Sequence, residues 1–137
     1  LKSERLNQYN EIKKHKQFFK ECQNHKILLK ELLVTLKKQN KKIIGYGAST
    51  KGNVLLQYCN INSKLLDYIS EVNKFKFNKY TPGSNIKIIS EKEAKIKKPD
   101  YMLVLPWHFK DHILQKEQHF LKNGGKLIFP LPDIEIV

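Results

Sequence analysis

Arginine is almost absent from this sequence: Arg5 is the only one, although lysine and arginine together number 26. The formal net charge is nevertheless +13, so the positive charge is carried by lysine. The guanidinium group of arginine makes bidentate hydrogen bonds to phosphates and to guanine edges. A sequence-specific nucleic-acid-binding protein that lacks arginine would therefore be unusual. We therefore predict a solvated lysine surface that attracts anionic ligands in general, and no nucleic-acid partner; binding to nucleic acid through charge alone stays open as an alternative.

Cysteine and long apolar runs are scarce as well. Cys22 and Cys59 are the only cysteines, too few for a disulfide framework and without metal-ligand spacing, so we expect free thiols, no metal site and a reducing cytoplasm. No apolar run approaches the roughly 20 residues that span a bilayer, and Leu1–Asn10 does not look like a signal peptide. We therefore predict a cytoplasmic protein without a membrane partner, and the start at Leu1 suggests a piece of a longer chain.

Glycine and proline are missing from residues 1–39. Apolar side chains recur there close to the 3.6-residue period of a helix, so this segment is predicted to be a helical linker that packs on one face of the remaining chain. A break is expected near Asn24 and His25. Residues 40–137 are predicted to form the substrate-binding domain.

Short apolar strands alternate with helical stretches beyond Lys41, and this alternation is typical of a parallel sheet. The fold class is therefore α/β, a Rossmann-like three-layer sandwich with five mostly parallel strands. The expected strands are Lys42–Tyr46, Leu65–Ile69, Ile86–Ile89, Tyr101–Leu105 and Lys126–Phe129, and the expected helices after the linker are Asn53–Tyr58 and Asp111–Lys122.

A glycine loop, Gly45–Gly52, follows the first expected strand and precedes a helix. Glycine lets the backbone approach a ligand, and the helix start offers free N–H groups to a phosphate. The candidate phosphate-binding residues are Gly47, Ala48, Ser49, Thr50 and Lys51. Asn53, one position beyond the loop, is a further candidate substrate-binding residue. The spacing departs from G-x-G-x-x-G, and a purely structural turn remains the alternative.

Further candidates follow the other expected strands, where ligands bind in parallel sheets. Glu71 is placed to receive a ribose hydroxyl, with an exposed loop acid as the alternative. The segment with Lys79, Thr81 and Gly83 is first of all a turn that could also line a ligand. Trp107 and His108 offer a stacking face and a titratable group, with a packed aromatic corner as the alternative.

Five motifs together resemble one family, the C-terminal domain of the SAM-dependent sugar C-methyltransferases. They are Ile43–Asn53, Lys79–Gly83, Lys98–Tyr101, Leu105–Phe109 and Gly124–Pro132, in this order. Ser84 and Lys87 stand where the family pattern has Thr and Pro, which leaves the sugar and the base open.

The resemblance implies methylation of a carbon, typically C3, of nucleotide-linked 4-keto-6-deoxysugars. It implies that S-adenosylmethionine and zinc are bound upstream of this chain, in a SAM-binding and a zinc-binding domain of the same protein. This chain would bind no cofactor, would be inactive alone, and would hold the nucleotide-linked sugar. His108 could assist the reaction only if the sugar reaches it. The alternative is the nucleotide-binding module of an NAD(P)-dependent oxidoreductase or sensor.

Overall fold

The computed structural model describes residues 1–137 and begins with one long helix, α1 (Lys2–Lys38). Its helical character confirms the prediction from composition. The predicted break near Asn24 and His25 is wrong, because α1 runs through both residues without interruption. Neither residue is a proline or a glycine, so nothing in the backbone forces the helix to stop there.

A six-stranded sheet forms the middle layer, with the order β3-β2-β1-β4-β5-β6. The first five strands are parallel and β6 is antiparallel to β5, so the predicted fold class is confirmed and a short edge strand is added. The strands are β1 (Ile43–Tyr46), β2 (Ile69–Glu71), β3 (Ile88–Ser90), β4 (Tyr101–Val104), β5 (Lys126–Phe129) and β6 (Glu135–Ile136).

The second strand lies further along the chain than its apolar run predicts. Leu65 lies in a turn, and Leu66 is fully buried in the segment between that turn and the strand. The amides of both leucines bond to the carbonyl of Asn62, which explains how they enter the core without a strand.

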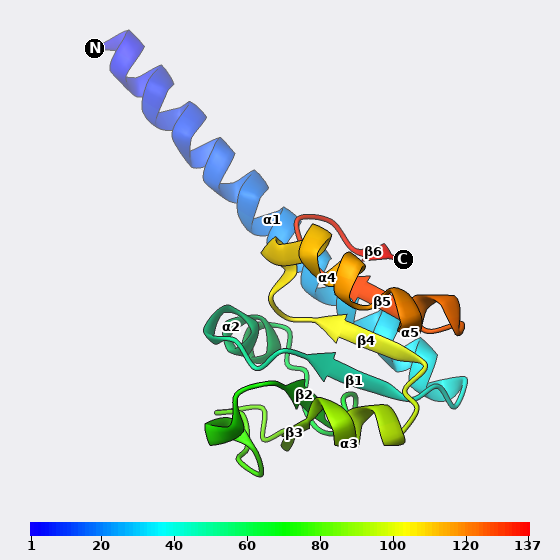
Figure 1. The fold of residues 1–137 in the computed structure, drawn as a ribbon. Coiled ribbons are helices and arrows are strands. Elements are labelled where there is room, and N and C mark those ends of the chain that lie inside the picture. The colour runs from blue at the N-terminus through cyan, green and yellow to red at the C-terminus, as the bar shows by residue number, and fades with distance from the viewer.

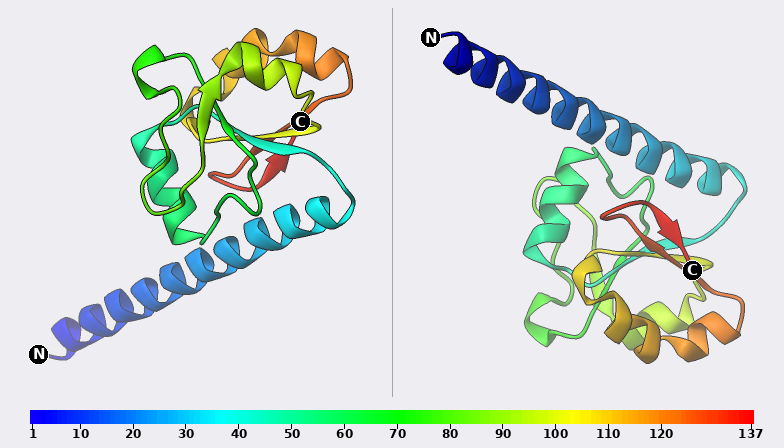
Figure 2. Two further views of the ribbon diagram at one scale, coloured as in Figure 1. Left: turned by 90° about the horizontal axis from the view of Figure 1, so that it is seen from below. Right: turned by 90° about the horizontal axis from the view of Figure 1, so that it is seen from above.

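Helices cover both faces of the sheet (Figures 1 and 2). One cluster of 16 buried side chains lies between the sheet and α1 with α2, and a second cluster of nine lies under α3, α4 and α5. The expected single helix over Asp111–Lys122 is divided at Glu117. The remaining elements are α2 (Thr50–Tyr58), α3 (Glu91–Ile96), α4 (Lys110–Lys116), α5 (Gln118–Lys122) and two 3-10 turns, η1 (Lys74–Lys76) and η2 (Trp107–Phe109).

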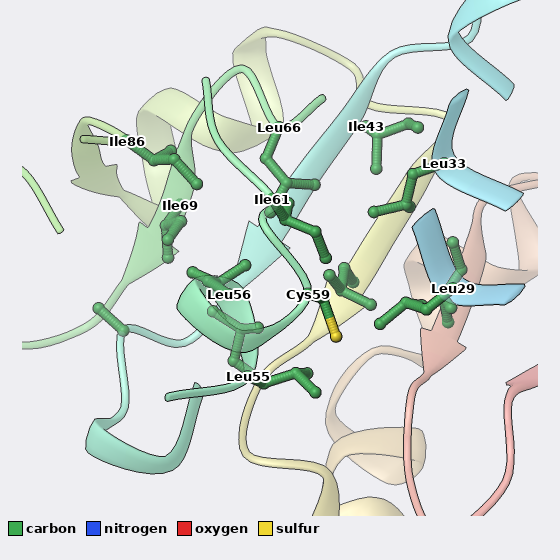
Figure 3. Packing of buried hydrophobic residues seen from close by; sticks show 14 of the residues in the cluster. Leu29, Leu33, Ile43, Leu55, Leu56, Cys59, Ile61, Leu66, Ile69 and Ile86 are labelled. Atoms are coloured by element: carbon green, nitrogen blue, oxygen red, sulfur yellow. The ribbon is translucent and has the colours of Figure 1, made fainter. Parts of the chain in front are cut away.

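The C-terminal half of α1 belongs to the core. Figure 3 shows Leu29 and Leu33 of α1 beside Cys59 and Ile43, and all four are fully buried. Burial raises the pKa of the Cys59 thiol, as expected for a cysteine that serves as a small apolar core residue. The helix is therefore anchored to the sheet by its second half.

The N-terminal half of α1 leaves the body of the molecule, as Figures 1 and 2 show. Every residue from 1 to 21 is exposed, including the large apolar side chains Ile12, Phe18 and Phe19. No helix, α1 included, combines the length and the apolar character needed to cross a membrane.

Candidate functional site

A pocket of about 290 Å³ opens at the carboxyl ends of the parallel strands. It lies beside the point where the strand order reverses, between β1 and β4, which is where ligands bind in open α/β sheets. The pocket is lined by Tyr46, Gly47, Ala48, Ser49, Ser70, Glu71, Val72, Lys76, Glu91, Pro106, Phe109, His112, Ile113 and Lys116. Four of the predicted site residues are among them: Gly47, Ala48, Ser49 and Glu71.

The glycine loop turns sharply from β1 into α2. Gly47 adopts φ +81°, a conformation that glycine tolerates best, and a Cβ added there would lie 2.9 Å from Cδ of Pro106. Ser49 caps α2, and its hydroxyl accepts a 3.0 Å hydrogen bond from the Gly52 amide. The amides of Thr50 and Lys51 have no acceptor within the helix, because a helix leaves its first N–H groups unpaired. This start of α2 can therefore receive an anion.

Glu71 lies at the end of β2 with only 9% of its surface exposed. Its Oε2 atom accepts hydrogen bonds from the amides of Val72 at 2.7 Å and Asn73 at 3.2 Å. Its Oε1 atom lies 3.5 Å from Nζ of Lys76. The carboxylate thus fixes the loop that follows β2, and one side of it already faces a cation.

Lys76 also lines the pocket. It was not predicted as a site residue, because it belongs to no sequence motif. It lies in η1, whose start is capped by the Asn73 side chain accepting from the Phe75 amide. From there its ammonium group donates a 2.7 Å hydrogen bond to the carbonyl of Ala48, in the glycine loop. Lys76 therefore joins the loop after β2 to the loop after β1.

The opposite wall of the pocket carries a second ion pair. Lys116 of α4 lies 2.7 Å from the Glu91 carboxylate at the start of α3, and its Nζ lies 5.9 Å from the Tyr46 ring. The Tyr46 hydroxyl donates to the buried Glu117. Burial, and then the charge and hydrogen bond of Glu117, raise the pKa of Tyr46 far above its usual value, so this phenol stays protonated.

Thr50 and Lys51 are exposed on the first turn of α2 and do not line the pocket. Asn53 follows them, and its amide bonds to the Ser49 carbonyl. The side-chain oxygen of Asn53 is buried without a hydrogen-bond partner. The structure therefore brings the backbone of this turn near the pocket, while these side chains lie beside it.

Thr81 and Gly83 lie outside the pocket, in a tight turn. The Thr81 hydroxyl accepts from the Ile86 amide at 3.0 Å and lies 2.5 Å from the hydroxyl of Ser84. Gly83 has φ +76°, and Gln57 of α2 donates to the neighbouring carbonyl of Pro82 at 2.7 Å. The structural role of this turn is therefore clear, while Lys79 is exposed beside it.

Trp107 and His108 lie in η2, which follows β4 after Leu105 and Pro106. Trp107 packs against both buried clusters, which is the arrangement of a packed aromatic corner. His108 is exposed, and its ring centre lies 4.2 Å from that of Phe109. From this segment it is Pro106 and Phe109 that line the pocket.

The sequence of residues 1–132 matches the family model described as the C-methyltransferase C-terminal domain. The chain belongs to this family. Among its relatives is the C-methyltransferase NovU of Streptomyces niveus, which is 36% identical over 109 residues, or 80% of this chain. The matched region is 26% of the length of NovU, so this C-methyltransferase C-terminal domain spans about a quarter of that relative.

The sequence resemblance implies a zinc ion in a domain upstream of this chain, not among the residues described above. Nowhere do three His, Cys, Asp or Glu side chains gather in a group that could hold a metal ion. Zinc is normally held by at least three such ligands.

Proposed function

We propose that this chain is the nucleotide-sugar-binding domain of a SAM-dependent sugar C-methyltransferase, acting on a nucleotide-linked 4-keto-6-deoxysugar, typically at C3. The observation that carries the proposal is the pocket at the strand-order reversal, with Gly47 to Ser49 on its wall and the start of α2 beside it. A diphosphate placed there would receive backbone N–H groups and the positive end of the helix.

The charges of the pocket suit a ligand that is partly anionic and partly polar. Its two lysines, Lys76 and Lys116, are each paired with a glutamate, so the lining side chains carry no large excess of positive charge. The unpaired backbone N–H groups at the start of α2 then contribute the field that a diphosphate needs. Hydroxyl groups of a ribose and a sugar can bond to the remaining polar atoms.

Exposed apolar side chains on the rim of the pocket support the proposal that another domain covers the pocket. Val72 and Phe109 line the pocket yet are 61% and 57% exposed, and the nearby η1 residue Phe75 is 85% exposed. Water has to be excluded from a carbon that is deprotonated and methylated. The SAM-binding domain of the same protein is the partner proposed for this rim, and S-adenosylmethionine and zinc would be bound in that upstream part.

The exposed half of α1 supports the same arrangement. In proteins most of the stability of a helix comes from tertiary packing of one of its faces, and residues 2–21 have no such packing within this chain. Because the chain corresponds to about a quarter of its relative NovU, we propose that an upstream domain packs against residues 1–21 in a cytoplasmic enzyme.

Calorimetry on this chain tests the proposal. Uridine, thymidine and guanosine diphosphates, NADH, S-adenosylmethionine and a short DNA duplex are titrated separately in moderate salt. We expect binding of at least one nucleoside diphosphate and no binding of NADH or S-adenosylmethionine. Binding of S-adenosylmethionine or NADH without any diphosphate would contradict it, as would DNA binding alone that is lost steeply as salt rises.

A substitution in the glycine loop, compared with a control elsewhere in α2, tests whether the diphosphate binds at this loop. Gly47→Val puts a branched side chain at φ +81° against Pro106, so it should abolish diphosphate binding. Val54→Ala, at an exposed position of α2, is the control and should bind normally. Normal binding by a folded Gly47→Val would move the site away from the glycine loop.

A further inference from the structure

We propose that Lys76, held in position by Glu71, is the cation that contacts the diphosphate in the pocket, in place of Lys51 of the glycine loop. This inference rests on the proposed function, because it names the side chain that recognises the charged part of that ligand.

The position of Lys76 is defined by two contacts on different loops. Its Nζ atom lies 2.7 Å from the Ala48 carbonyl and 3.5 Å from Oε1 of Glu71. Ala48 lies between Gly47 and Ser49, so the ammonium group is placed at the turn where an anion would meet the start of α2. The Lys76 side chain is 42% exposed, and the residue lines the pocket, so a ligand can reach it.

The donor count of an ammonium group leaves room for a ligand. Lysine has three N–H donors and no acceptor. One donor goes to Ala48 and one faces Glu71, so one remains for a phosphate oxygen. A flexible lysine otherwise loses side-chain entropy when it is fixed on a ligand, and these two contacts have already restricted it.

Glu71 acts through Lys76 and is a positioning residue. Its Oε2 atom is occupied by the amides of Val72 and Asn73, which holds the carboxylate rigidly, and its Oε1 atom faces the ammonium group. A ribose hydroxyl would have to compete with these partners. The acid at the end of β2 therefore orients a cation here.

Lys51 has none of these features. Its side chain is exposed on α2, makes no hydrogen bond or ion pair within the chain, and does not line the pocket. Its position in the glycine loop made Lys51 the expected phosphate contact. In the structure it is Lys76 that contacts this loop, through Ala48, which lies 28 residues earlier in the chain.

The experiment measures affinities of five variants for uridine, thymidine and guanosine diphosphates by calorimetry, and for the matching uncharged nucleosides by NMR titration. The variants are Lys76→Met, Lys76→Arg, Glu71→Gln, Lys51→Met and the control Lys14→Met, which lies on the exposed part of α1. Thermal unfolding checks that each variant is folded.

Lys76→Met should weaken diphosphate binding about tenfold to a hundredfold, the range for a hydrogen bond to a charged group, and leave nucleoside binding unchanged. Lys76→Arg should recover most of the loss. Glu71→Gln should cause a smaller loss, and Lys51→Met should resemble Lys14→Met.

The inference is overturned if Lys76→Met binds the diphosphate as the wild type does. It is equally overturned if Lys76→Met loses nucleoside and diphosphate affinity alike, since that pattern indicates a structural role, or if Lys51→Met loses more. A wild type that binds no nucleoside diphosphate would remove the proposed function and this inference together. Wild-type binding with an unaffected Lys76→Met would remove this inference only.

Discussion

The Tyr46 hydroxyl donates a 3.0 Å hydrogen bond to the carboxylate of Glu117, across a separation of 71 residues in the chain. Tyr46 ends β1, and Glu117 stands at the junction of α4 and α5. Both residues are buried, with 8% and 7% of their surfaces exposed. This contact fixes the two helices over the end of β1, on one wall of the pocket.

Tyr46→Phe should lower the free energy of unfolding by about 1–3 kcal/mol, because it leaves the buried Glu117 carboxylate without its hydrogen-bond donor. Glu117→Gln keeps an acceptor for the tyrosine and should cost less. Tyr9→Phe, at a site on α1 that is 63% exposed, is the matched control and should have almost no effect. Urea unfolding measures all three; an unchanged midpoint for Tyr46→Phe would show that the contact adds nothing to stability.

The same tyrosine predicts how stability changes in alkaline solution. The folded chain raises the pKa of Tyr46 above its value in the unfolded chain, so its contribution to stability is complete below about pH 10. Above that pH the Tyr46 phenol loses its proton in the unfolded state and keeps it in the folded state. This difference lowers the free energy of unfolding by at most about 1.4 kcal/mol per pH unit. Tyr46→Phe should show a shallower decline than the wild type between about pH 10 and 11.5, measured by urea unfolding. Parallel curves for the two proteins would argue against this prediction.

Gly52→Ala should destabilise the chain, although alanine normally stabilises a helix by about 0.5–1 kcal/mol relative to glycine. A Cβ at position 52 would lie 2.5 Å from Cβ of Leu105 and 2.9 Å from the Ser49 hydroxyl. Such overpacking typically costs about 1–3 kcal/mol, which reverses the usual sign. Thermal unfolding of Gly52→Ala and of the exposed-site control Val54→Ala tests this, and a rise in the melting temperature of Gly52→Ala would refute it.

Hydrogen exchange should divide α1 into two parts. Amides of residues 2–21 should exchange rapidly, because no part of the chain covers their side chains. Amides around Leu29, Leu33 and Leu36 should be protected, because these side chains are buried against the sheet. Mass spectrometry of peptic peptides provides the measurement. Equal protection along the whole helix would mean that its exposed half is already covered, for instance by a second copy.

The sequence alone determined the class of fold and the place of the glycine turn after the first strand. Both depend on local patterns: apolar strands that alternate with helices, and glycines after the first strand. The turn around Gly47 could be predicted because few residues other than glycine adopt its positive φ. Cys59 lies in the core because a free cysteine behaves as a small apolar side chain, whereas Cys22 is only partly buried.

Other elements could not be read from local patterns. Leu65 and Leu66 look like a strand but reach the core from a turn and the segment after it, which only the hydrogen bonds to Asn62 reveal. The strand β6 has two exposed residues, and its existence depends on pairing with β5.

The composition of the pocket was decided by the tertiary structure. Lys76, Lys116 and Glu91 belong to segments without any motif, and the sheet order brings them to the same opening as the glycine loop. Lysine and glutamate are common surface residues, so their presence in a sequence says nothing about a site. The distance between Lys76 and the Ala48 carbonyl is a property of how the loops after β1 and β2 pack, and that packing depends on contacts distant in sequence. Sequence could therefore place the glycine turn, while only the folded chain could show which side chains stand beside it.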